Sequence, residues 1–186
     1  QYGQYVKEVK LDNCAINLKI VGLNSSIFCG YDGDDKERLA LGLEQVSSCD
    51  LLIDSESELV IACIHHPLKC FHPCDRTSLT IMQRFSDIIL SGHLHEPSTT
   101  FVADGKVGET IFLSAGSAYE WREKENGFNI IELDLINLDG KVITYKYKSD
   151  EHLWIINKDI NRENNGVFNF KVQKKIVSVH KNIDTI

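Results

Sequence analysis

The sequence of 186 residues has no apolar run that approaches the roughly 20 residues needed to span a bilayer as a helix. It also lacks basic runs, and 20 lysines and arginines against 27 aspartates and glutamates give a net charge of -7. Because phosphate-backbone binding needs clustered lysine and arginine, this balance argues against a surface that coats nucleic acid, although a local basic groove is compatible with it. The remaining composition, 42% hydrophobic and 25% charged, is typical of a globular domain.

The six cysteines show no recurring spacing that would predict a disulfide framework. Cys63 lies within an apolar run, where a free thiol packs as a small hydrophobic group. We therefore expect reduced thiols and a cytoplasmic protein. The chain has no signal peptide and opens Gln-Tyr-Gly-Gln without a methionine, so we expect a processed chain or a fragment.

Apolar runs and turn signals predict a series of strands and helices. Two hairpins are expected, with turns at Asp104-Gly105 and Asp139-Gly140, because Asp-Gly between apolar runs favours a tight turn. Trp154 is expected in the core. Residues 1–13 read as a loop or an edge strand. The other expected elements are strands at 17–23, 58–64, 87–91, 100–103, 110–113, 127–135 and 141–148, and helices at 36–48 and 76–85.

A polar stretch at 157–166 predicts a linker, followed by a strand-like segment at 167–180. That segment is either a further strand of the same domain or the first strand of another unit. We therefore divide the chain into a main domain, residues 1–157, and a C-terminal extension, residues 158–186.

Histidines follow two of the predicted buried strands. His65-His66-Pro67 comes directly after one apolar run, and Gly92-His93-Leu94-His95 follows the next. Side chains two residues apart in an extended segment point the same way, so His93 and His95 are expected on one side. Gly92 is expected to allow the sharp turn at the strand end. Neutral imidazole is a common ligand of zinc, iron and manganese, so a metal site is favoured over purely structural histidines.

These two motifs resemble the last two signatures of the calcineurin-like metallophosphoesterases, a pattern shared by purple acid phosphatases and cyclic-nucleotide phosphodiesterases. Four flanking segments resemble the same family, and the resemblance covers about residues 17–157. It implies an α/β fold, an α/β/β/α sandwich of mixed sheets, of which this chain is the C-terminal part. The flanking segments are 21–26, Glu44-Gln45, 113–117 and 127–134.

The resemblance also implies a metal-dependent phosphoric ester hydrolase with two divalent ions, manganese, iron or zinc, that acts on a phosphomonoester or a phosphodiester. His65 and His93 would bind one ion and His95 the other, while His66 would support the ligands or face the substrate. Two such ions, about 3.5–4 Å apart, clamp a phosphoester and activate a water.

The family's earlier signatures are missing: Gly-Asp-x-x-Asp and Gly-Asn-His are absent from the sequence, and no Asp-x-His precedes the two histidine motifs. The resemblance assigns to them a bridging aspartate, an asparagine ligand and the general acid. We therefore expect no catalytic acid in this chain. We also expect the chain to be inactive alone, unless an N-terminal half or another chain completes the site.

Three weaker hypotheses remain open. Cys70, His72 and Cys74 could hold part of a zinc site, but a loop beside the metal centre is favoured because further ligands are missing. A nuclease of the same superfamily is disfavoured by the acidic charge. A non-catalytic scaffold of the same fold that binds a protein partner is the third, and the retained histidines argue against it. The acidic residues at 31–35 suit a helix start better than a calcium loop.

Overall fold

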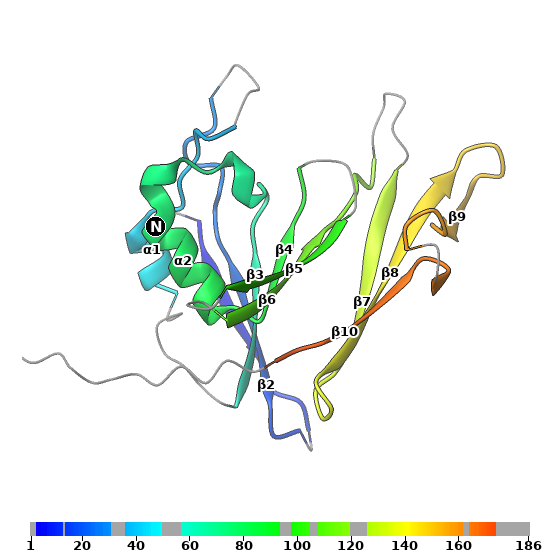
Figure 1. The fold of residues 1–186 in the computed structure, drawn as a ribbon, viewed down its shortest axis with the longest axis horizontal. Coiled ribbons are helices and arrows are strands. Elements are labelled where there is room, and N and C mark those ends of the chain that lie inside the picture. Colours follow the sequence, from blue (N-terminus) through cyan, green and yellow to red (C-terminus); the bar gives the residue numbers. More distant parts are fainter. Residues whose placement is uncertain are drawn as a thin grey trace, which may run out of the picture.

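Two β-sheets stack against each other, and the helices cover the outer face of only one of them (Figure 1). The computed structural model describes the chain in eight segments. These are residues 3–12, 14–30, 36–49, 57–93, 98–104, 108–119, 126–161 and 164–173.

The first sheet has six strands in the order β1-β2-β3-β4-β6-β5. The four central strands run parallel, and the edge strands β1 and β5 are antiparallel to their neighbours. This mixed sheet within an α/β fold confirms the predicted fold class. The strands are β1 (Tyr5–Val9), β2 (Asn17–Gly22), β3 (Glu58–Cys63), β4 (Ile88–Ser91), β5 (Ser98–Asp104) and β6 (Gly108–Ser114).

The second sheet is antiparallel, in the order β10-β8-β7, and β9 pairs with the far half of β8. Val167 of β10 is opposite Ile143 and Lys171 is opposite Asp139, so the strand-like segment after the polar stretch joins this sheet. The division of the chain at residue 157 stays a prediction. The strands are β7 (Gly127–Asp134), β8 (Asp139–Lys148), β9 (Leu153–Ile156) and β10 (Val167–Lys171).

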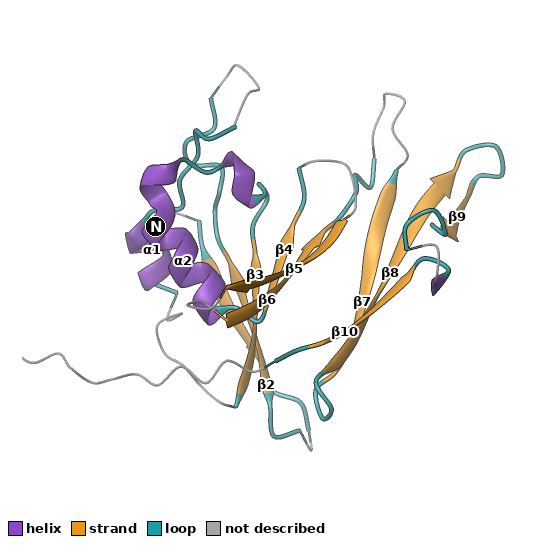
Figure 2. Ribbon diagram, viewed as in Figure 1, coloured by secondary structure: helices purple, strands orange, loops and turns teal. Residues whose placement is uncertain are grey.

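Alternation along the parallel strands divides their side chains between two cores, because successive residues of a strand point to opposite faces. Leu59 and Ile61 of β3 face the second sheet, where they pack with Val142 and Phe170. Ala62, on the other face, packs with residues of the two α-helices. These helices are α1 (Leu43–Ser47) and α2 (Arg76–Phe85), and Figure 2 shows both on the same side of the six-stranded sheet.

Helix α1 is much shorter than the helix predicted for residues 36–48, which was wrong at its N-terminal end. Leu39 instead forms an isolated bridge with Phe71, and its N–H donates to the carbonyl of Cys70. Gly42, with φ of 80°, interrupts the backbone just before the helix begins. Tertiary partners therefore take the hydrogen bonds that a longer helix needs, while α2 begins and ends where the pattern predicted.

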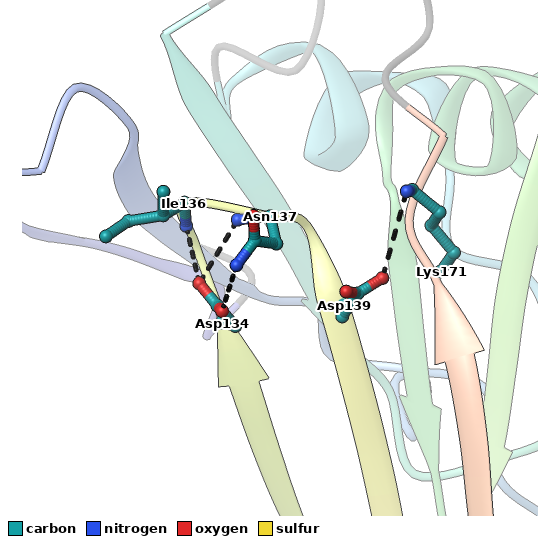
Figure 3. A network of polar contacts seen from close by, with 5 residues as sticks. All are labelled: Asp134, Ile136, Asn137, Asp139 and Lys171. Atoms are coloured by element: carbon teal, nitrogen blue, oxygen red, sulfur yellow. Dashed lines mark hydrogen bonds and ion pairs between the residues drawn. The ribbon is translucent and has the colours of Figure 1, made fainter.

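The turn of the second hairpin was also predicted at the wrong residues. The chain turns at 135–138, and Asp139 and Gly140 already belong to β8. Figure 3 shows why: the Asp134 carboxylate accepts hydrogen bonds from the backbone N–H groups of Ile136 and Asn137. The side-chain hydrogen bond from Asn137, and then these backbone bonds, lower the pKa of Asp134.

Trp154 was expected in the core, but 40% of its surface is exposed on β9. It packs edge-on against Phe128, which stacks on Tyr145, so an aromatic cluster stabilises the end of this sheet.

None of the described helices has the length and apolar character that a membrane crossing requires.

The close contact between Gly140 and Phe170 predicts a measurable cost of substitution. A Cβ at position 140 would lie 2.3 Å from Cζ of the buried Phe170 ring. We expect Gly140→Ala to lower the free energy of unfolding by about 1–3 kcal/mol, the usual cost of overpacking. Urea unfolding of the whole chain, followed by circular dichroism, measures the change.

Gly30→Ala is the matched control, because a Cβ there meets nothing within 4 Å. It should change the free energy of unfolding by no more than about 0.5 kcal/mol. Equal stabilities of the two variants would contradict the pairing of β10 with β8.

Candidate metal centre

The two histidine motifs lie together because β3 and β4 are adjacent parallel strands, whose carboxyl ends meet at one edge of the sheet. The ladder continues beyond the strands. The N–H of Ile64 donates to the carbonyl of Leu90 at 2.9 Å, and the N–H of Gly92 donates to the carbonyl of His65 at 3.0 Å. These hydrogen bonds connect the segment that carries His65 directly to the segment that carries His93.

Three imidazole rings form a compact cluster at this edge. Ring centroids lie 4.7 Å apart for His65 and His66, 5.2 Å for His65 and His93, and 4.5 Å for His66 and His93. One ring nitrogen from each lies within 4.8 Å of the others. His65 is exposed, His93 is half-buried and His66 is buried.

This donor set fits a divalent ion of the borderline class. Two imidazole nitrogens on one tetrahedral zinc, each about 2.0–2.1 Å from it, lie about 3.4 Å apart. The ligand nitrogens of the cluster lie up to 4.8 Å apart, which exceeds this nitrogen–nitrogen distance by about 1.5 Å at most. Rotation of the side chains would have to close this gap when an ion binds. Among the described residues, no other three residues offer potential ligand atoms that lie within 4.8 Å of one another.

His93 has φ of 70°, in the left-handed region that residues with a Cβ seldom adopt. We expected Gly92 to provide the sharp turn, but it is His93 that takes the positive φ. A residue held in this region stores about 1–3 kcal/mol, and such positions concentrate at functional sites. The surrounding structure therefore fixes the direction in which His93 leaves the strand.

Ser25, which sequence reasoning did not single out, lies directly behind the cluster. It follows β2, the other parallel neighbour of β3, and its Oγ accepts hydrogen bonds from the N–H groups of His65 at 3.2 Å and His66 at 3.1 Å. The same Oγ lies 2.9 Å from Nδ1 of His66. On the other side of this ring, Nε2 lies 3.6 Å from Sγ of the exposed Cys29.

The segment that carries Ser25 is itself held by a buried amide. Oε1 of Gln45, on α1, accepts the N–H of Asn24 at 2.6 Å, and Nε2 donates to the carbonyls of Asn24 and Leu41. Gln45 is 1% exposed. The short helix α1 therefore positions the histidines through Asn24 and Ser25.

The loop with Cys70, His72 and Cys74 serves a structural purpose. Nδ1 of His72 accepts the N–H of Cys74, and Cys70 is buried in the helix-side core. The next residue, Asp75, is buried; its carboxylate accepts the N–H of Leu41 at 2.6 Å and the hydroxyl of Ser78. The three potential ligands of this loop form no group comparable to the histidine cluster, so the zinc hypothesis for it gains no support.

A hollow of about 310 Å³ lies elsewhere, among residues of β7, β8 and β10, and contains none of the histidines. Its carboxylates already have partners: Glu132 pairs with Lys141, and Asp139 lies 4.0 Å from Lys171. We assign no function to it. His95, the third predicted ligand, lies outside the described residues, as do residues 120–125 and the acidic stretch 31–35.

Comparison with known proteins identifies one similar curated sequence. The chain is 25% identical over 129 residues to an uncharacterized metallophosphoesterase-like protein of Bacillus subtilis (strain 168), YydB. The match covers 68% of this chain and 27% of that protein, so the chain spans about a quarter of the length of the relative it matches. No family model matches the chain.

Among solved structures, GAP50 of Plasmodium, described as the anchor in the inner membrane complex, is 10% identical with a TM-score of 0.47. That match covers 92% of this chain and 54% of GAP50. A phosphatase of Mycoplasma pneumoniae is 10% identical with a TM-score of 0.37, over 91% of this chain and 57% of that one. The predicted resemblance to the calcineurin-like metallophosphoesterases is confirmed by the curated relative.

The hydrogen bonds of Ser25 predict a stability effect that its neighbour does not share. Ser25→Ala removes the acceptor of two N–H groups, and we expect it to lower the free energy of unfolding by about 1–3 kcal/mol. Ser26→Ala is the control, because Ser26 is exposed and bonds Asn24 and Cys29 through its backbone N–H and carbonyl.

Thermal or urea unfolding of both variants measures the difference, and equal stability would show that Ser25 does not hold the histidine segment.

Proposed function

We propose that the chain forms part of a metal-dependent phosphoric ester hydrolase, in which His65 and His93 bind one divalent ion and His95 the second. The observation that carries this proposal is the cluster of imidazoles at the carboxyl ends of β3 and β4. Ligand sites of α/β sheets concentrate at this edge, because the loops that follow parallel strands converge there.

The donor set favours zinc, iron or manganese over magnesium or calcium. Imidazole suits the borderline transition metals, whereas magnesium and calcium prefer oxygen ligands. Divalent ions bound here would polarise the phosphoryl oxygens and lower the pKa of a water molecule. The residues of the chain orient the imidazoles: the N–H of Gly92 fixes the carbonyl of His65, and the left-handed backbone fixes His93.

Among the described residues, the cluster consists of histidines and contains no carboxylate. Two divalent ions repel each other, and a bridging carboxylate offsets that repulsion. We propose that a further segment or a second chain supplies it together with the general acid. The substrate would be a phosphomonoester or phosphodiester. We retain residues 1–157 as the C-terminal part of a metallophosphoesterase domain and the cytoplasm as its location.

Metal binding is the direct test. The purified chain should bind zinc, and His93→Asn should weaken the affinity about 100-fold or more, since loss of a residue that merely orients a ligand costs about 10–100-fold. Competition with a chromophoric chelator measures the affinity. Asparagine suits the position because it tolerates positive φ.

His152→Asn is the matched control, because His152 also has positive φ, 53°, but lies in the turn before β9 beside Tyr147. It should leave zinc affinity unchanged. Absence of bound zinc, iron and manganese in the wild-type chain would overturn the assignment of an ion to His65 and His93, and their absence from the complete protein would favour the scaffold.

Manganese-dependent hydrolysis of bis(p-nitrophenyl) phosphate, lost in His93→Asn, would show catalysis by this chain alone and would correct our expectation that it needs a complement.

A further inference from the structure

The hydroxyl of Ser25 determines which nitrogen of His66 carries the proton. A serine hydroxyl has two lone pairs and one hydrogen. Two backbone N–H groups, of His65 and His66, donate to Oγ and occupy both lone pairs. The hydroxyl hydrogen remains for the third contact, Nδ1 of His66 at 2.9 Å. Ser25 therefore donates to Nδ1, and Nδ1 is the accepting nitrogen.

A neutral imidazole carries one proton, so the proton of His66 lies on Nε2. Nε2 faces Sγ of Cys29 at 3.6 Å, a separation suited to an N–H···S hydrogen bond. The backbone, Ser25, His66 and Cys29 thus form one chain of donors. This chain runs from two backbone N–H groups to an exposed sulfur.

A histidine binds a metal through a ring nitrogen that keeps its lone pair. In His66 the lone pair of Nδ1 is already engaged by the hydroxyl of Ser25, and Nε2 is protonated. One of its nitrogens lies within 4.8 Å of a nitrogen of His65 and of His93, but the hydrogen bonds of the His66 ring remove it from the donor set. We propose that Ser25 is a positioning residue that holds His66 as an N–H donor and leaves the metal to His65 and His93.

This inference rests on the proposed function for the identity of the metal site. It explains why a third imidazole lies beside the site without binding the metal. His66 is 2% exposed and packs edge-on against His65, with ring planes at 84°. As a further ligand it would fill a coordination position. Catalytic metal sites keep a position open for water or substrate, whereas structural sites are closed. Ser25 therefore keeps the centre open by fixing the tautomer of its nearest spare imidazole.

The tautomer can be read directly in the metal-free protein. Long-range ¹H–¹⁵N correlation of the full chain, labelled at histidine, distinguishes a protonated ring nitrogen from one with a free lone pair. We expect His66 to show protonated Nε2 and unprotonated Nδ1. Ser25→Ala should lose this preference, and Ser25→Thr, which keeps the hydroxyl, should restore it. Ser26→Ala, the control, should match the wild type.

Protonated Nδ1 in the wild-type protein, or an unchanged tautomer in folded Ser25→Ala, would overturn the inference. Addition of zinc provides the second arm. Zinc should shift the ring nitrogens of His65 and His93 and leave Nε2 of His66 protonated, and zinc on His66 would also overturn the inference. If no zinc binds, the proposed function fails, while the metal-free spectra still decide the role of Ser25.

Discussion

The parallel pairing of β3 with β4 is the constraint on which the candidate site depends. It places Cys63 beside Leu90, and the N–H of Gly92 then reaches the carbonyl of His65. Apolar residues on both faces of these strands hold the pairing in place, since one face packs on the helices and the other on the second sheet. A site built on such strand ends inherits the rigidity of the core beneath it.

The polar groups around the histidines hold the histidine backbone and rings in fixed orientations. Buried Gln45 holds Asn24, the adjacent Ser25 holds the backbone of His65 and His66, and His93 is held in a left-handed conformation. Each contact removes a rotational freedom before any metal binds. The cost is a strained backbone at His93 and a buried polar network, both of which the two cores must stabilise.

Most of the strands, though not β9, and the meeting of the two histidine motifs could be predicted from the sequence, because apolar runs that end in turn residues mark strand ends directly. Ser25 and Cys29 could not be predicted, since their contacts with His66 depend on which strand lies beside β3. The prediction was wrong at the N-terminal end of α1, because Cys70 and Asp75 accept the N–H groups of Leu39, Leu41 and Gly42. The expectation that Trp154 is buried was wrong, because an aromatic residue on a sheet face can pack against its neighbours and still remain exposed.

The central claim is that one divalent ion lies between His65 and His93 while His66 stays outside its coordination sphere. A crystal structure of the zinc-loaded chain, with anomalous scattering recorded at the zinc edge, tests it most directly. The account predicts an anomalous peak about 2.0–2.1 Å from one nitrogen of His65 and one of His93, and no bond to His66. A peak bonded to His66, or one at Cys70 and Cys74 with none at the histidines, would contradict it.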